Sequence, residues 1–248
     1  MYLKRFTYDK EHCYTLNDNN EIHHQSIKEI CKKKNLYELT NKEGNIVHRN
    51  LFEKKLFGEV ETSFTPFFDE MLETITKKES ILEFLEKDDN RNCLIWFMTS
   101  LLLRNKLTIE QTQAVGSELG INWTFQEAKN NGILHNASLS KYLSDKWAEE
   151  FNIIVHTNWT EEPFITADFP FCMLPPVTQS WRFWYFPVAP QCLLILEPRQ
   201  LTGLQMDKEL NSSIEFVQSI NQLFGLHKDA LLISNDKDVL EKLRKWRL

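Results

Sequence analysis

The sequence has few glycines and no closely spaced cysteines, and these shortages exclude several classes of protein. Seven glycines in 248 residues leave no Gly-rich phosphate loop, no dinucleotide-binding glycine pattern and no Gly-x-Ser-x-Gly nucleophile elbow. The five cysteines form no Cys-x-x-Cys pair and are scattered over Cys13, Cys31, Cys93, Cys172 and Cys192. An odd number of dispersed cysteines favours free thiols in a reducing compartment over a disulfide framework.

Long apolar runs are also missing. The most apolar segment, residues 93–103, is much shorter than the roughly 20 residues that a membrane-spanning helix needs. The first residues lead straight into charged sequence and do not form a signal-peptide pattern. We therefore expect a cytoplasmic protein with no membrane partner.

The charge balance limits the mode of nucleic-acid binding. A formal net charge of −6 argues against a protein that coats nucleic acid nonspecifically, because such binding needs an excess of Lys and Arg. A local basic groove is compatible with this balance. Seven Trp and seventeen Phe provide material for a large core or for a pocket that stacks on rings.

The pattern of apolar residues predicts an α+β fold in a single compact unit. The unit has a β/α part at residues 1–48, a helical part at 49–151, and a β-rich part with C-terminal helices at 152–248. The connections after residue 151 are too short for helical crossovers, so we expect a mainly antiparallel sheet beside a helical centre.

Local signals predict the individual elements. In the first part they are strands at 3–8, 12–16 and 35–39, turns at 17–20 and 41–45, and a helix at 26–33. In the second part we expect a helix that breaks before Pro66, a buried helix at 91–105, a capping box at 108–111, and an amphipathic stripe ending at Phe151. In the third part we expect strands at 152–157, 163–167, 181–187, 192–197 and 230–233, a helix at 207–224, and a terminal helix capped by Asn235.

Four short motifs occur in a characteristic order. They are Tyr2-Leu3-Lys4-Arg5-Phe6, then Ser26–Ile30 leading to Asn35-Leu36-Tyr37, then Glu53 with Glu61, and finally Phe164–Pro170. Their order and spacing over residues 2–72 and 155–197 resemble the bacterial family known as domain of unknown function 4238 (DUF4238). Members usually carry Gln-His-Tyr-x-Pro just ahead of the first motif, and this sequence begins at Met1 inside that region. The resemblance implies a bacterial or phage-related protein and no agreed activity.

Two glutamates could form an acidic site. Glu53 is in phase with an apolar helix face, where an unpaired carboxylate costs several kcal/mol. Glu61 lies eight residues on, about 80° further around an ideal helix. Such a pair could bind a divalent cation, Mg or Mn, or divide acid and base roles. The alternative is that Glu53 is an exposed acid in the first helical turn and that Glu61 pairs with a lysine.

Arg104 and His135 are the candidates for the remaining catalytic roles. Arg104 closes the buried helix and could neutralise the glutamates or hold a phosphate, or it could serve only the helix dipole. His135 lies at the mouth of a predicted helix as a possible base or ligand, although a lone histidine is commonly a satisfied polar residue. His24, with its neighbour His23, and His156 rank below it.

Asp168 is the strongest single candidate. It stands at a predicted strand end, where Thr166 and Pro170 would fix the direction of its carboxylate. Where family members commonly have Ser-Asp-Asn-Pro, this chain has Ala167-Asp168-Phe169-Pro170. The alternative is a turn acid that binds nearby backbone amides.

Three residues are candidates for substrate binding, namely Tyr37, Thr166 and Trp181. Trp181 begins an aromatic run that is typical of strand core, and it could also provide a stacking platform beside Asp168.

The sequence leaves three hypotheses about function. The first is a metal-dependent phosphodiesterase or nuclease acting on nucleic acid or a nucleotide, with Glu53, Glu61 and Asp168 as ligands of Mg or Mn and with Arg104 and His135 assisting. The second is a non-catalytic binding module with a protein partner in a defence or toxin-type assembly. The third, metal-free hydrolysis or transfer, has no recognised nucleophile motif to support it. We rank the first slightly ahead of the second.

Overall fold

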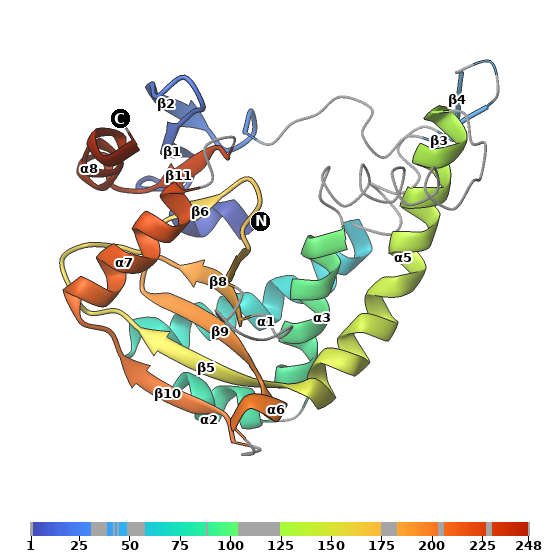
Figure 1. Cartoon of the computed structure of the whole chain (residues 1–248). Coiled ribbons are helices and arrows are strands. Elements are labelled where there is room, and N and C mark those ends of the chain that lie inside the picture. Colours follow the sequence, from blue (N-terminus) through green and yellow to red (C-terminus); the bar gives the residue numbers. More distant parts are fainter. Residues whose placement is uncertain are drawn as a thin grey trace. The chain divides into compact units, whose positions relative to one another are not determined.

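A computed structural model of the whole chain describes residues 2–30, 39–41, 43, 45–48, 58–87, 89–103, 125–174, 183–202, 206–226 and 230–247. A run of helices lies between two runs of strands that form mainly antiparallel sheets (Figure 1), so the predicted α+β class is confirmed. The backbone divides into two compact units. The first contains residues 1–32, 71–85 and 150–248, and the second contains 33–70 and 86–149. In the described ranges no helix is long and apolar enough to cross a membrane.

Two sheets organise the first unit. A four-stranded sheet has the order β2-β1-β11-β6, and a five-stranded sheet has the order β10-β5-β9-β8-β7. The strands are β1 (His12–Leu16), β2 (Ile22–Ser26), β5 (Phe151–Thr157), β6 (Thr166–Ala167), β7 (Cys172–Leu174), β8 (Phe183–Ala189), β9 (Cys192–Pro198), β10 (Lys208–Asn211) and β11 (Leu232–Ser234). All pairs between these strands are antiparallel except β10 with β5, which is parallel.

Helices and a 3₁₀ turn complete this unit. They are η1 (Tyr2–Phe6), the end of α1 (Gly58–Thr76), α2 (Ile81–Glu86), α6 (Arg199–Thr202), α7 (Ile214–Gly225) and α8 (Lys237–Arg247). Glu209 links β10 to the start of α2. Its carboxylate accepts hydrogen bonds from the Ser80 hydroxyl (2.6 Å) and from the Leu82 N–H (3.1 Å). This carboxylate therefore caps the start of α2, where backbone N–H groups lack helical partners.

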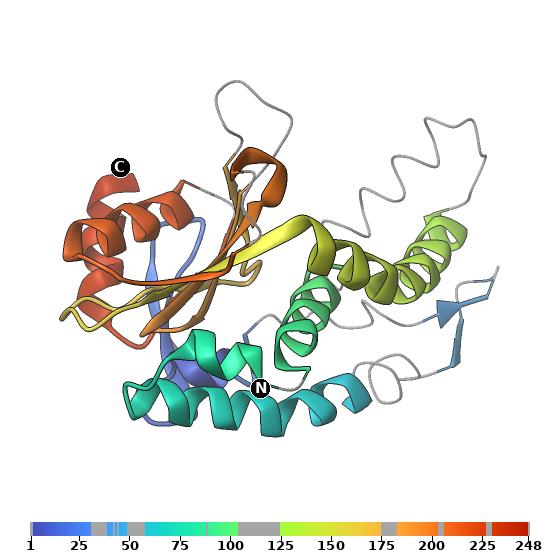
Figure 2. The same cartoon turned by 90° about the horizontal axis from the view of Figure 1, so that it is seen from below.

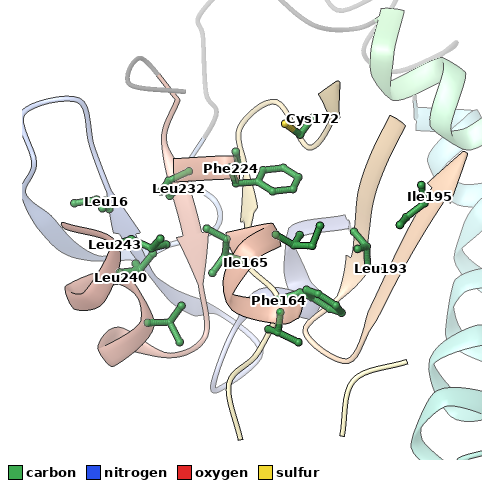
Figure 3. Packing of buried hydrophobic residues seen from close by; sticks show 14 residues of the cluster. Leu16, Phe164, Ile165, Cys172, Leu193, Ile195, Phe224, Leu232, Leu240 and Leu243 are labelled. Atoms are coloured by element: carbon green, nitrogen blue, oxygen red, sulfur yellow. The ribbon is translucent and has the colours of Figure 1, made fainter. Parts of the chain in front are cut away.

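The core of the first unit lies where α7 and α8 meet the sheets. Strand β9 is buried from Cys192 to Leu196, as expected for a continuous apolar run covered on both faces. Figure 3 shows Leu193 and Ile195 of β9 in the same cluster as Phe164, beside Phe224 of α7. Figure 2 shows α7 and α8 together on one side of the strands. The apolar face of α7 repeats at helical spacing, which accounts for this packing.

Two expectations for the N-terminal segment were wrong. The predicted strand at 3–8 is instead the 3₁₀ turn η1, in which Tyr2 and Phe6, four residues apart, are both buried. A helix was predicted at 26–33, but Ser26 is the last residue of β2 and residues 27–30 form a turn. The turn at 17–20 is confirmed as the β1–β2 hairpin. Its Asn20 has φ 64°, a left-handed conformation that Asn tolerates better than most residues.

In its described residues, the second unit consists of helices and one small hairpin. Its elements are β3 (Leu39–Thr40), β4 (Ile46–His48), α1 up to Glu70, α3 (Asn90–Leu103) and α5 (Phe125–Glu150). Seven of the fourteen residues of α3 are buried, in agreement with the prediction of a buried helix. Phe97 of α3 packs edge-on against Phe64 and Phe68 of α1, with ring centroids 5.2 and 4.4 Å apart.

The predicted break before Pro66 was wrong, because α1 runs through it. A proline inside a helix costs about 3 kcal/mol. The flanking side chains of Phe64, Phe67 and Phe68 are almost fully buried, and each burial contributes roughly 1.5–3 kcal/mol. Pro66 itself is exposed. The packing around the proline therefore outweighs the lost helical hydrogen bond.

The C-terminal part also differs from expectation in two places. Residues 207–224 form β10 followed by α7, not one helix, and Ser213 caps α7 through its hydroxyl. The terminal helix α8 is capped by Asp236, whose carboxylate accepts from the Asp238 N–H at 2.8 Å, and not by Asn235. The predicted capping box at 108–111 lies outside the described residues.

Candidate functional site

Four aromatic and imidazole rings gather on one face of the β1–β2 hairpin. This hairpin ring cluster consists of Tyr8, His12, Tyr14 and His24. His12 and Tyr14 lie two residues apart on β1 and so share a face, while His24 is the direct partner of Tyr14 on β2. The Tyr8 backbone N–H donates to the His12 carbonyl at 3.1 Å, which brings the fourth ring alongside.

The ring cluster is open to solvent on one side and supported on the other. The ring centroids of His12 and His24 are 5.1 Å apart, and those of Tyr8 and Tyr14 are 5.4 Å apart. Tyr8 is 46% exposed and His24 is exposed, whereas Tyr14 packs against the core. Stacked rings with a solvent-facing edge are able to accept a further flat ring.

A carboxylate orients one imidazole of the cluster. His12 Nδ1 lies 2.8 Å from Asp9 Oδ2. The other oxygen, Asp9 Oδ1, accepts from the backbone N–H groups of Glu11 (3.0 Å) and His12 (2.7 Å). The Glu11 N–H, followed by the N–H and imidazole of His12, holds the pKa of Asp9 down at about 2 against partial desolvation. Asp9 is therefore ionised at neutral pH and fixes the orientation of His12.

A phenol orients the second imidazole. The Tyr8 hydroxyl is hydrogen-bonded to His24 Nε2. Partial desolvation, followed by the negative charge of Asp9, raises the pKa of Tyr8 above its ordinary value. The phenol thus keeps its proton at neutral pH and is able to donate to His24.

A single half-buried histidine of the same unit lies beside a serine hydroxyl. His156 on β5 stacks on Phe216 with ring centroids 4.2 Å apart, and the Ser212 hydroxyl lies 3.5 Å from His156 Nδ1. Burial lowers the pKa of His156 to about 4. Such an imidazole is a weak base at neutral pH, so the pair is unsuited to activating a nucleophile.

Asp168, the strongest sequence candidate, lies directly after β6 and is exposed. Its Oδ1 accepts from the backbone N–H groups of Phe169 (3.0 Å) and Leu231 (3.1 Å), and its own N–H donates to the Leu231 carbonyl. The carboxylate thus connects the turn after β6 with the residue that precedes β11. In the part of the chain that the structure describes, no three His, Cys, Asp or Glu side chains gather as metal ligands.

Thr166 belongs to the interior, where it joins two of the sequence motifs. The Tyr2 hydroxyl donates to the Pro187 carbonyl at 2.5 Å, so the Thr166 hydroxyl donates to the Tyr2 oxygen at 2.6 Å. The Tyr2 ring also stacks on Phe186 at 5.4 Å. The Tyr-Leu-x-x-Phe motif and the Phe164–Pro170 motif are therefore in direct contact.

A family model described as "Protein of unknown function (DUF4238)" matches residues 1–238. The chain belongs to this family. No curated protein and no solved structure is significantly similar to the chain. In this DUF4238 protein, Tyr2 contacts Thr166 on β6 of the four-stranded sheet and Pro187 on β8 of the five-stranded sheet. Two of the family-like motifs therefore share a structural role, which is to hold η1 against both sheets.

The side chains of the other sequence candidates do not belong to the described part of the structure. Glu53, Arg104, Tyr37 and Trp181 lie outside the described residues. Glu61 on α1 and His135 on α5 have described backbones only. The metal-ligand set of Glu53, Glu61 and Asp168 stays a prediction.

Sequence reasoning ranked His24 low and did not consider His12 with it. One signal was present, since three of the seven histidines fall within residues 12–24. The strand at 22–26 was not predicted, however, and without its pairing with β1 the alignment of His24 with Tyr14 is not visible.

Proposed function

We propose that this DUF4238 protein is a binding module for single-stranded nucleic acid or nucleotides, with the hairpin ring cluster as its stacking platform. The observation that carries the proposal is the group of packed Tyr and His rings on one hairpin face, of which Tyr8 and His24 are exposed to solvent. Bases stack on Tyr and His rings, and each stacked base contributes about 1–3 kcal/mol. The polar edges of these rings also supply hydrogen bonds to bases.

The charges around the cluster favour stacking over phosphate contacts as the source of affinity. Asp9 is ionised beside the rings, and the net charge of the chain is −6. A protein that neutralises many phosphates loses affinity steeply as salt rises. We expect a shallow dependence of affinity on salt for this protein.

The proposal is tested by fluorescence anisotropy with short labelled single-stranded RNA and DNA. Tyr8→Ala and His24→Ala should each weaken binding by roughly 5- to 150-fold, the equivalent of one lost stacking contact. Tyr142→Ala is the matched control, because Tyr142 is also an exposed tyrosine, at 56%, and lies in the second unit. Equal affinities of the Tyr8, His24 and Tyr142 variants, or no binding by the native chain, would refute the proposal.

The hydrolase hypothesis and the hypothesis of a protein partner in a defence or toxin-type assembly stay predictions from the sequence. The described residues contribute Asp168 to the first and add no residue to the second. Both are distinguishable from nucleic-acid binding, since the first requires Mg or Mn and the second does not depend on the ring cluster.

A further inference from the structure

We infer that the hairpin ring cluster also cleaves RNA without a metal, using His12 as general base and His24 as general acid. This inference rests on the proposed function, because the rings must first hold a single strand. The pairing of each imidazole with its own orienting group, Asp9 or Tyr8, points to paired acid–base roles. General acid–base catalysis needs such groups within reach of one reacting phosphate.

Asp9 prepares His12 for the role of base. The Asp9 carboxylate accepts a hydrogen bond from the Nδ1–H of His12, so the free lone pair of the neutral imidazole is on Nε2. Two backbone N–H groups hold the carboxylate in place. Within the described residues, His12 Nε2 has no hydrogen-bond partner, so it is open to a substrate hydroxyl.

Tyr8 orients His24 in the opposite sense. The phenol engages Nε2, so the second nitrogen, Nδ1, is the one that faces a ligand. In the imidazolium form both nitrogens carry protons, so the Nε2–H donates to the phenol oxygen and the Nδ1–H is the proton available for transfer. His24 Nδ1 also has no hydrogen-bond partner in the described ranges. The 5.1 Å between the two ring centroids is short enough for both rings to contact one phosphodiester.

The reaction balances without an oxidant or a metal. His12 Nε2 takes the proton of a ribose 2′-hydroxyl, and that oxygen attacks the adjacent phosphorus. The bond from phosphorus to the 5′-oxygen breaks as His24 Nδ1–H donates its proton to that leaving oxygen. The products are a 2′,3′-cyclic phosphate and a 5′-hydroxyl, and solvent restores the two imidazoles to their starting protonation. DNA lacks the attacking hydroxyl and is not cleaved.

The experiment follows a labelled single-stranded RNA in excess EDTA, with DNA and 2′-O-methyl RNA of the same sequence as uncleavable ligands. Cleavage of RNA alone, with 2′,3′-cyclic phosphate ends, is expected. His12→Ala and His24→Ala should each lower the cleavage rate by roughly 100-fold or more, the usual contribution of one acid or base. His23→Ala, on the same hairpin but outside the ring cluster, is the control that should keep the native rate.

Asp9→Asn separates a positioning role from a structural one. The amide keeps one oxygen for the two backbone N–H groups. Its NH₂ group replaces the oxygen that accepts the hydrogen bond from His12 Nδ1. The cleavage rate at saturating RNA should fall by roughly 10-fold or more, while the dissociation constant for 2′-O-methyl RNA stays within about twofold of native. A loss of affinity without a loss of rate would overturn the positioning role.

The outcomes distinguish this inference from the proposed function. Binding of 2′-O-methyl RNA without cleavage of RNA overturns the inference and leaves the binding proposal standing. Failure to bind either ligand overturns both. Cleavage that EDTA abolishes, or that survives in His12→Ala, also overturns the inference, because the two imidazoles would then not be its source.

Discussion

Replacement of His156 by Phe should remove part of the acid sensitivity of the protein. The imidazole is half-buried on β5 and stacks on Phe216, and burial lowers its pKa from 6.5 to about 4. In the unfolded chain the same group binds a proton as soon as the pH falls through about 6.5. The unfolded state therefore binds more protons than the folded state between these two pKa values, and stability falls as the pH falls through this window.

The size of the effect follows from the two pKa values. The difference of 6.5 − 4 = 2.5 pKa units corresponds to an upper limit of about 3.4 kcal/mol once the pH is below both values. Between about pH 7 and about pH 5 the linkage relation gives a loss of about 2 kcal/mol from this group alone. A phenyl ring preserves the stack on Phe216 and binds no proton.

Urea unfolding at the two pH values, followed by far-UV circular dichroism, measures this difference. The native chain should lose about 2 kcal/mol more than His156→Phe on acidification. His23→Gln removes an exposed histidine instead, and it should retain the native pH dependence. An equal loss of stability in the native chain and in His156→Phe would show that this imidazole is not buried in a neutral form.

Four further substitutions test the fold and the sequence candidate. Asp168→Asn should lower the free energy of unfolding by about 1 kcal/mol, because a neutral amide oxygen accepts backbone N–H groups more weakly than a carboxylate; unchanged urea unfolding with loss of an Mg- or Mn-dependent activity would show a chemical role instead. Phe97→Ala should cost roughly 3–5 kcal/mol and Trp96→Ala less, since Phe97 is buried and Trp96 only half-buried; the reverse order in thermal unfolding would contradict the packing of α3. Glu209→Ala should cost roughly 1–2 kcal/mol by removing the cap of α2, with hydrogen exchange accelerated at 81–86; native protection there would refute the capping role.

The sequence was sufficient for elements whose signal is local. Strands β5 and β9 were predicted within a residue at each end because their apolar runs are bounded by polar turns. The β1–β2 turn was predictable from its four consecutive Asn and Asp residues. The buried character of α3 followed from apolar residues on every face.

Elements that depend on distant partners were missed. Strand β10 is polar and pairs with β5 more than fifty residues earlier, as in Lys208 with Ile154, so a local window assigns it to the helix that follows. The 3₁₀ turn η1 owes its conformation to partners such as Thr166 and Pro187. The ring cluster has the same cause, since its rings meet only after β2 has paired with β1.

The contact of Tyr2 with Pro187 has a consequence for synthesis on the ribosome. The two residues are 185 positions apart, and a ribosome adds about 5–20 residues per second. Tyr2 therefore lacks its partners on β8 for roughly 10–40 s after it has been synthesised. Strand β1 remains unpaired on one edge for longer still, because its partner on that edge is β11. During this interval the aromatic η1 and one edge of β1 are exposed in the nascent chain, and this is when binding of a chaperone to the N-terminal segment would have its greatest effect on the yield of folded protein.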